Sequence, residues 1–327
     1  MTKGAPPPDK TVAGDATSAA NGFVAGEAMS LKRPNVIAMF ASAAPSDRQS
    51  QTLLKTTQTL GWRNRYSQAE LYPIDITSPS MTTPIAFRVR QVQRGETDGT
   101  YGTGATVWPA SMVLIKYLQR IPNKLKNRAV IDLGAGTCVA SIAAAALGAR
   151  LVVCTDGNDH VMQLAEENVD MACRELKSHL VPSVPMLDTK PRGVGIPGAQ
   201  NRRIGSCEVR VRTFWWGRDD AAMLDELPES RRYYDVILVS DCVLPKLYPI
   251  EPLVKSIAFL SGPNTTTYIS YEHRYFPHFD PRDRFRELAR DNGLQVRVVS
   301  MEEQDPKYSV EDIEIWEVTK NFCEPNK

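Results

Sequence analysis

Acidic residues at the ends of short apolar runs, together with the glycines beside them, are the first candidates for chemistry. The run 129–133 contains Asp132 and leads into Gly134-Ala135-Gly136. After a segment of small residues, a second run at 151–155 ends at Asp156. This order predicts a strand, a glycine turn, a helix and a strand, a unit that holds nucleoside-containing ligands at the carboxyl ends of parallel strands. The glycines let the backbone approach such a ligand, and the second acid is placed to accept hydrogen bonds from a ribose diol.

The glycine pattern distinguishes between two classes of cofactor. A dinucleotide site requires G-x-G-x-x-G, but Val139 stands at the third glycine position. S-adenosylmethionine (SAM) has no pyrophosphate, so its site does not need a helix N-terminus as an anion cradle. Asp132 suits SAM because this ligand carries an ammonium and a sulfonium. The residues therefore favour SAM, and an ordinary turn in another α/β protein is the alternative.

A third acid, Asp241, follows the nearly continuous apolar run 234–240, which is typical of a central parallel strand. Substrates bind beyond the carboxyl ends of such strands, so this carboxylate is placed to accept a hydrogen bond from a substrate ammonium and to aim its nitrogen. A structural cap on the following turn is the other interpretation. Trp108 and Trp216 stand just outside predicted elements, where a ring covers a cofactor or packs into the core.

The elements that must position these residues form an alternating series of strands and helices. Seven core strands are predicted at 129–133, 151–155, 207–213, 234–240, 265–271, 294–300 and 313–318. Helical periodicity is clearest at 158–180, where apolar residues recur at spacings of three and four. This order predicts an α/β, doubly wound, Rossmann-like sheet of seven strands with helices on both faces.

Composition divides the 327-residue chain into segments. They are a disordered tail at 1–30, an extension at 31–105 that packs on the core, a core domain at 106–320 and a short tail at 321–327. The first tail is rich in Ala, Gly, Thr, Ser and Pro and buries too little apolar surface to fold. The extension contains an alternating pattern that predicts a strand near 84–92. A Pro/Gly-rich stretch at 182–206 predicts a loop insertion in the core domain.

Charge and cysteine use exclude several classes of partner. The net charge of +1 gives no electrostatic reason to expect nucleic acid. The four histidines lack the spacing of metal ligands, so no metal is expected. No apolar run reaches the length of a membrane span, which predicts no membrane partner. The six cysteines contain no C-x-x-C pair and predict reduced, buried thiols in a cytoplasmic or nuclear protein.

Several motifs taken together resemble family 16 of the seven-strand methyltransferases, also called the methyltransferase-like 21 group. They are Val107-Trp108-Pro109-Ala110, Phe214-Trp215-Trp216-Gly217, 235–243, 251–255 and 270–274. The resemblance covers about residues 84–320. Within it, the tail at 302–315 is most similar to the family member that methylates the valosin-containing protein, an AAA ATPase.

The resemblance implies a class I methyltransferase sheet whose last strand is antiparallel. It implies an enzyme, a protein-lysine N-methyltransferase that acts as a monomer on an AAA ATPase or a chaperone. It also implies that SAM is contacted by Trp108, Gly134, Ala135, Gly136, Asp156, Trp216 and Ser240. Asp241 then begins an acid-x-x-aromatic motif that handles the target lysine, and Tyr271 and Glu272 line the lysine pocket.

The chain departs from the family pattern at one position of that motif. Leu244 stands where the family has an aromatic residue, and Tyr248 is near enough in sequence to replace it. Two alternatives remain, and this departure favours the first of them. One is a methyltransferase-like scaffold that binds partners, which the intact acids and glycines oppose. The other is a small-molecule N-methyltransferase, for which the sequence offers no recognisable substrate pocket.

Overall fold

A computed structural model describes residues 61–78, 81, 83–92, 99–177, 202–218, 220–245 and 247–321. All of these belong to one unit of the chain, Leu53–Lys327. The predicted tail at 1–30, nearly all of the tail at 321–327 and most of the predicted insertion at 182–206 lie outside the described residues.

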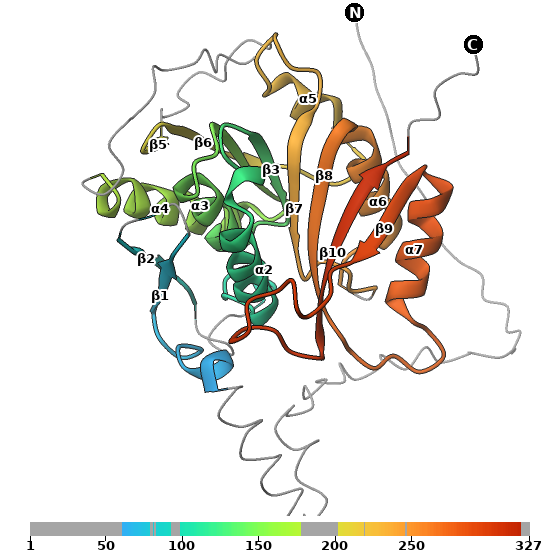
Figure 1. Ribbon diagram of the computed structural model, residues 1–327, viewed down its shortest axis with the longest axis horizontal. Coiled ribbons are helices and arrows are strands. Elements are labelled where there is room, and N and C mark those ends of the chain that lie inside the picture. The colour runs from blue at the N-terminus through green and yellow to red at the C-terminus, as the bar shows by residue number, and fades with distance from the viewer. Residues whose placement is uncertain are drawn as a thin grey trace, which may run out of the picture. The chain divides into compact units, whose positions relative to one another are not determined.

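An eight-stranded sheet forms the centre of this unit, in the order β5-β6-β4-β3-β7-β8-β10-β9 (Figure 1). Its strands are β3 (Ala129–Leu133), β4 (Leu151–Asp156), β5 (Arg202–Ile204), β6 (Cys207–Thr213), β7 (Tyr234–Ser240), β8 (Ser261–Glu272), β9 (Leu294–Val298) and β10 (Ile313–Lys320). Strands β6, β4, β3, β7 and β8 run parallel, whereas β10 is antiparallel to both of its neighbours. The predicted α/β class and the antiparallel last strand are confirmed.

The sheet has one strand more than the seven predicted. The additional strand, β5, lies within the predicted loop insertion and pairs antiparallel with β6. Gly205 joins the two strands with a φ of +60°, a conformation that glycine adopts without steric cost. A strand of three residues is too short to show a hydrophobic period, so the sequence pattern could not indicate it.

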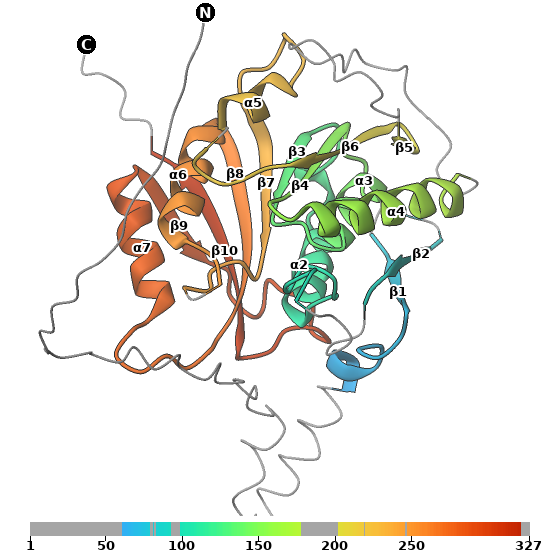
Figure 2. The same cartoon turned by 180° about the vertical axis from the view of Figure 1, so that it is seen from behind.

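Helices cover both faces of the sheet (Figure 2). One face carries α2 (Pro109–Arg120), α3 (Val139–Ala146) and α4 (Asp159–Glu175), and the other carries α5 (Asp220–Asp225), α6 (Ile250–Leu260) and α7 (Pro281–Asp291). A short 3-10 turn, η2 (Pro122–Lys124), follows α2. Alternation along β3 supplies both cores, because Val130 packs on the first face and Ile131 on the second. No helix among the described residues has the length and apolar composition to cross a membrane.

The helices that follow β4 and β8 start at residues that cap them. The Asn158 side chain accepts hydrogen bonds from the N–H groups of His160 and Val161 at the start of α4. Asp280 caps α7 by accepting from the Arg282 N–H. Asn158 comes two residues after the end of β4, and Asp280 ends the loop that follows β8. These caps fix the start of each helix relative to the carboxyl edge of the sheet.

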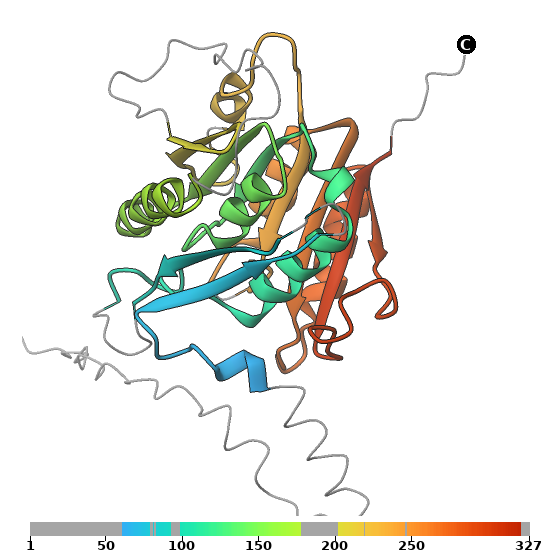
Figure 3. The ribbon, with the colours of Figure 1, turned by 60° about the vertical axis from the view of Figure 1, so that its left-hand side comes forward.

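A two-stranded ribbon, blue in Figure 3, forms the described part of the predicted extension. It consists of β1 (Leu71–Ile76) and β2 (Ile85–Arg90), paired antiparallel. Buried Asn168 in α4 joins it to the core: its Oδ1 accepts from the Arg90 N–H at 2.6 Å, and its Nδ2 donates to the carbonyls of Arg90 at 2.9 Å and Thr137 at 3.1 Å. Strand β2 lies within the range 84–92 where the sequence predicts a strand, and Asn168 connects it to α4.

Candidate active site

The turn between β3 and α3 requires glycine at two positions. Gly134 and Gly136 have φ values of +74° and +54°, in the region that side chains with a Cβ rarely adopt. A Cβ on Gly134 would lie 2.7 Å from Cys242 Sγ, and one on Gly136 would lie 2.9 Å from the Gly104 carbonyl oxygen. Between them, the Ala135 N–H donates to the Thr155 carbonyl at 2.8 Å. The backbone of the turn is therefore held tightly between β4 and the loop before α2.

Asp156 ends β4 beside this turn. Its Oδ2 accepts from the Gly136 N–H at 3.2 Å, and its Oδ1 accepts from the Asn158 N–H at 3.1 Å. Burial raises the pKa of this carboxyl, and these N–H groups oppose the rise. Each oxygen keeps a further lone pair, so the carboxylate is still able to accept hydrogen bonds from the hydroxyl groups of a ligand that lies against the turn.

Asp132 lies deeper than the sequence predicts. It is fully buried, and its Oδ2 accepts from the Ser141 hydroxyl at 2.6 Å, which fixes α3 to β3. Its Oδ1 has no partner among the described residues, and burial raises its pKa to about 7. The predicted direct contact with a cationic ligand is therefore not supported, because the enclosing chain leaves this carboxylate no exposed surface.

Aromatic side chains from separate loops meet beside the glycine turn. The ring of Trp216 lies 3.3 Å from the position of a Cβ on Gly134. The ring of Tyr248 lies 5.9 Å from the Trp216 ring, and its hydroxyl is hydrogen-bonded to the Thr103 hydroxyl. Trp108 donates from Nε1 to the Thr103 carbonyl at 2.8 Å. Trp216 thus lies at the turn, and Trp108 is connected to it through Thr103 and Tyr248.

The Tyr248 ring lies beside Trp216, four residues after the motif position that the family fills with an aromatic residue. Leu244, at the motif position, is 8% exposed and belongs to the apolar interior. The Tyr248 N–H donates to the Leu244 carbonyl at 2.8 Å, a local turn that brings the tyrosine back beside the site. Burial raises the pKa of its hydroxyl, so this group stays protonated at neutral pH. Ser240, the last residue of β7, has a buried hydroxyl without a partner among the described residues.

Asp241 lies at the end of β7 and is paired with an arginine. Its Oδ1 accepts from Arg274 Nη1 at 2.7 Å, and its Oδ2 accepts from Arg274 Nη2 at 2.5 Å. The Glu272 N–H donates to Oδ1 at 3.3 Å. Asp241 is 5% exposed and has a φ of +56°. This backbone conformation is uncommon for residues other than glycine, and where it occurs it is often at a functional site. This bidentate pair was not predicted from the sequence, although Arg274 stands in one of the matched motifs.

Glu272 extends this pair into a chain of charges. Its Oε2 lies 3.3 Å from Arg274 Nη2, and its Oε1 lies 4.0 Å from Arg63 Nη1. Arg63 in turn donates to both carboxylate oxygens of Asp312, at 2.7 and 2.5 Å. Glu272 therefore lies with Asp241, as predicted, and the extension before β1 reaches the same cluster through Arg63.

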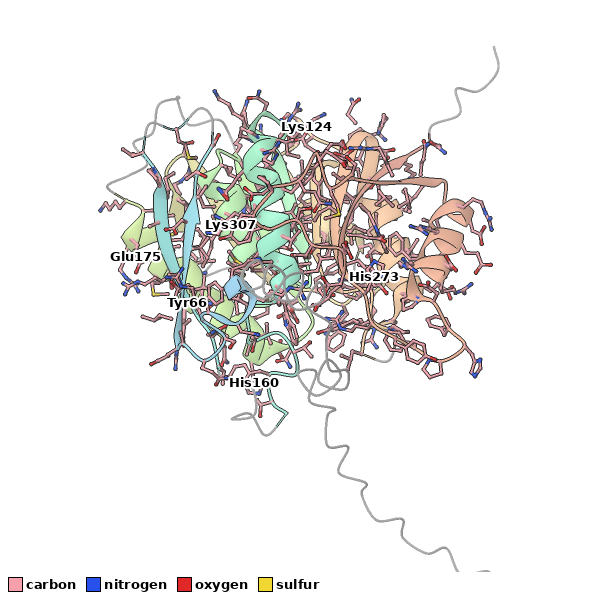
Figure 4. The ribbon with its side chains drawn as sticks, turned by 60° about the horizontal axis from the view of Figure 1, so that its bottom comes forward. Tyr66, Lys124, His160, Glu175, His273 and Lys307 are labelled. Carbon is pink, nitrogen blue, oxygen red and sulfur yellow. The ribbon has the colours of Figure 1, made fainter. Side chains whose placement is uncertain are left out.

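Tyr271 occupies a different place from its predicted one. Its ring is 1% exposed and stacks on Trp316 at 5.1 Å, with His273 at 5.3 Å. His273, labelled in Figure 4, has its Nε2 2.9 Å from Glu314 Oε1. Successive side chains of a strand point to opposite faces, so Tyr271 packs under α7 while Glu272 faces Asp241. Its predicted place in a lysine pocket is not supported.

The described residues show no metal-binding cluster of His, Cys, Asp or Glu. Five of the six cysteines fall in the described part, and all five are free thiols. One of them, Cys242, follows Asp241 and lies with its Sγ 3.6 Å from the Leu133 carbonyl. The side chains described at this site are carboxylates, hydroxyls, arginines, aromatic rings and the Cys242 thiol.

Comparison with known proteins agrees with this geometry. Residues 90–187 match the model of a family described as lysine methyltransferase. The matched residues are about three tenths of the 327-residue chain. Its fold is that of a class I methyltransferase, and SAM is the cofactor of this class.

Three relatives with named activities are 24–30% identical to the chain over the aligned residues. The protein N-terminal and lysine N-methyltransferase efm7 of Schizosaccharomyces pombe is 24% identical over 62% of this chain and 69% of its own length. The protein N-lysine methyltransferase METTL21A of Xenopus tropicalis is 30% identical over 53% and 63%. The EEF1A lysine methyltransferase 3 of the same species is 27% identical over 53% and 59%. The chain spans about three fifths of the length of the two Xenopus relatives.

The residues of the site fit SAM. The carboxylate of Asp156 is placed for ribose hydroxyls, and the unpartnered hydroxyl of Ser240 lies at the same edge. The rings of Trp216 and Tyr248 provide an apolar cover beside the turn. Oxygen acceptors next to aromatic surface are what a ligand with a nucleoside and a cationic amino acid requires.

Proposed function

We propose that this protein transfers a methyl group from SAM to a lysine side chain of a protein substrate. One contact carries the proposal: the thiol of Cys242 packs on Gly134, where a Cβ would lie 2.7 Å away. Because Cys242 directly follows Asp241, the acid predicted to face the substrate is held next to the turn predicted to hold the cofactor. The family match supports lysine as the acceptor.

On the cofactor side, the chain binds and orients. When bound, SAM supplies a methyl group on a sulfonium, which is an excellent leaving group. Asp156 holds the ribose diol, and Gly134 and Gly136 admit the ligand to the backbone. Trp216 and Tyr248 cover it and exclude water. Catalysis then depends mostly on alignment of the attacking nitrogen with the methyl carbon.

On the substrate side, the charged cluster at the ends of β7 and β8 receives the lysine. Asp241 and Glu272 are buried or half-buried, and both are paired with Arg274. Cys242, the residue after Asp241, packs on Gly134 together with the Trp216 ring, and Tyr248 lies beside that ring. A lysine side chain that enters here brings its terminal nitrogen toward the cofactor.

The substrate proposed is an AAA ATPase of the valosin-containing type or a chaperone. The similarity of the tail at 302–315 to the corresponding family member supports it. Relatives named for lysine methylation of EEF1A and for protein N-terminal methylation make an elongation factor and a terminal amine the competing outcomes.

Transfer of labelled methyl from SAM into an extract of cells that lack this protein tests the proposal. We expect one or two labelled protein bands with the wild type and none with Asp241→Ala, while calorimetry shows that Asp241→Ala still binds SAM. Loss of SAM binding in that variant would contradict the assigned role of Asp241.

The same experiment separates the alternatives. Label that appears only in small molecules would favour a small-molecule N-methyltransferase. SAM binding without transfer to any acceptor would favour a scaffold. Either outcome would overturn the proposed function.

A further inference from the structure

Arg274 occupies the position that a substrate ammonium would take at Asp241. Both oxygens of Asp241 accept from its guanidinium, at 2.7 and 2.5 Å, and the side chain of Asp241 is 3% exposed. Arg274 is 28% exposed at its side chain and is also held by the Glu272 carbonyl at 3.1 Å. Each oxygen of the acid thus already accepts from a cation of the protein itself.

The charges around this pair nearly cancel. Facing it are Glu272 from β8, Arg63 from the segment before β1, and Asp312 from the residue before β10. The nearby tyrosines add no charge: burial raises the pKa of Tyr271 to about 12 and also raises that of Tyr248. Three carboxylates therefore stand against two guanidiniums, and the outermost carboxylate, Asp312, is 47% exposed at its side chain.

The chemistry of methyl transfer needs such a balance. A lysine amine has an ordinary pKa of about 10.4, so only about one in a thousand is unprotonated near pH 7.4. Only the unprotonated amine has the lone pair that attacks the methyl carbon. A bare pair of carboxylates would favour the ammonium form and would hold the substrate in its unreactive state.

We propose that Arg274 is a positioning residue that cancels the charge of Asp241, so that the site receives the target lysine as the unprotonated amine. The inference rests on the proposed function and concerns the protonation state in which the lysine enters the site. The proton leaves to solvent before transfer. The nitrogen lone pair then forms the N–C bond, the S–C bond breaks, and its electron pair stays on sulfur.

Three variants test the proposal by the pH at which the rate of methyl transfer reaches half its maximum. The rate is measured on the labelled protein band of the extract. The extract is diluted until the initial rate of labelling is proportional to the concentration of the extract. Arg274→Gln leaves the carboxylates unbalanced and moves the midpoint up by about one pH unit. Asp241→Asn keeps the shape of the side chain and one acceptor oxygen, unlike Asp241→Ala, but leaves the charge of Arg274 unbalanced, so the midpoint moves down. The double variant returns it near the wild-type value.

Arg284→Gln is the matched control, because Arg284 lies on the surface of α7 and pairs with Glu287. It should leave the midpoint unchanged. Equal midpoints in the wild type, Arg274→Gln and Asp241→Asn would overturn the proposal. If one of the two single variants, Arg274→Gln or Asp241→Asn, does not fold, the shift of the midpoint in the other one tests the proposal. A labelled band with unshifted midpoints refutes this inference alone, whereas no labelled band with the wild-type protein refutes the proposed function.

A second readout needs no turnover. In protein labelled with carbon-13 at the aspartate carboxyls, NMR titration follows Asp241, assigned by its loss in Asp241→Asn. In the wild type, the Arg274 guanidinium favours the ionised form of Asp241. Arg274→Gln removes this effect and should therefore raise the pKa of Asp241. An unchanged pKa would show that the two groups are not paired in solution.

Discussion

The hydroxyl groups of Tyr248 and Thr103 are hydrogen-bonded to each other, although 145 positions of sequence separate them. This bond joins the loop after β7 to the loop before α2, directly beside the glycine turn. The Gly104 carbonyl, one residue on, lies so close to Gly136 that a Cβ there would be 2.9 Å away. The two loops therefore act as one cover for the cofactor site.

Replacing Tyr248 by Phe tests that cover. The variant keeps the ring beside Trp216 and loses only the bond to Thr103. A single hydrogen bond contributes about 0.5–1.5 kcal/mol, so the Kd for SAM should rise about two- to tenfold in calorimetry. Tyr275→Phe is the control, because Tyr275 is 85% exposed. Equal Kd values for Tyr248→Phe and the wild type would show that the bond does not support the site.

Asp156→Asn tests the ribose contact. The amide replaces one acceptor oxygen by a donor and removes the charge, and hydrogen bonds to a charged group contribute about 1.5–3 kcal/mol. SAM affinity should fall by about ten- to a hundredfold in the same titration. Asp159→Asn removes a neighbouring acid that accepts from the Thr213 hydroxyl at 3.1 Å, and it should bind SAM normally. Wild-type affinity in Asp156→Asn would remove this residue from the site.

Gly134→Ala tests the turn itself. The new Cβ meets Cys242 Sγ at 2.7 Å, and φ stays at +74°. Strain of this kind costs about 1–3 kcal/mol, which should appear as a lower free energy of unfolding in urea. Placing the change in a Cys242→Ala background should recover part of the loss, because the clash goes while the backbone strain stays. No recovery would mean that the sulfur contact is not the cause.

Asp132 predicts a pH dependence of stability. Its folded pKa of about 7 lies above the ordinary value of 3.8, so between these values the folded chain holds a proton that the unfolded chain releases. Stability from this group is full below about pH 4 and is lost as the pH rises through 7. Within that window one pH unit corresponds to about 1.4 kcal/mol.

Thermal unfolding without SAM checks this dependence. Relative to the wild type, Asp132→Asn should gain stability between pH 5 and pH 8, because the amide does not ionise. Asp283→Asn, an exposed acid on α7, should follow the wild type at both pH values. Parallel curves for the wild type and Asp132→Asn would show that the buried carboxyl does not titrate in this range.

Much of the frame follows from local sequence. The parallel strands appear as continuous apolar runs, and the Gly134 and Gly136 turn follows from their spacing. The strand β1 was missed although its residues alternate, because Pro73 within it argues against a strand. Tyr271 and Glu272 were both expected in the lysine pocket, but they are successive residues of β8 and point to opposite faces of the sheet.

The pairing of Asp241 with Arg274 had no local signal. It depends on the register between β7 and β8, in which Ser240 lies opposite Ser270, and on the path of the chain after Glu272. The contribution of Arg63 likewise depends on where the extension packs. Long-range charge pairs of this kind become visible only when the sheet edge has been assembled.

The position of the transferred methyl group is the most direct test of the central claim. Labelled proteins from the extract, digested and sequenced by mass spectrometry, should carry the methyl on the ε-nitrogen of a lysine, and Asp241→Ala should leave that lysine unmodified. A methyl found only on an N-terminal α-amine, on another side chain, or on no protein would contradict the assignment of this protein as a protein-lysine methyltransferase.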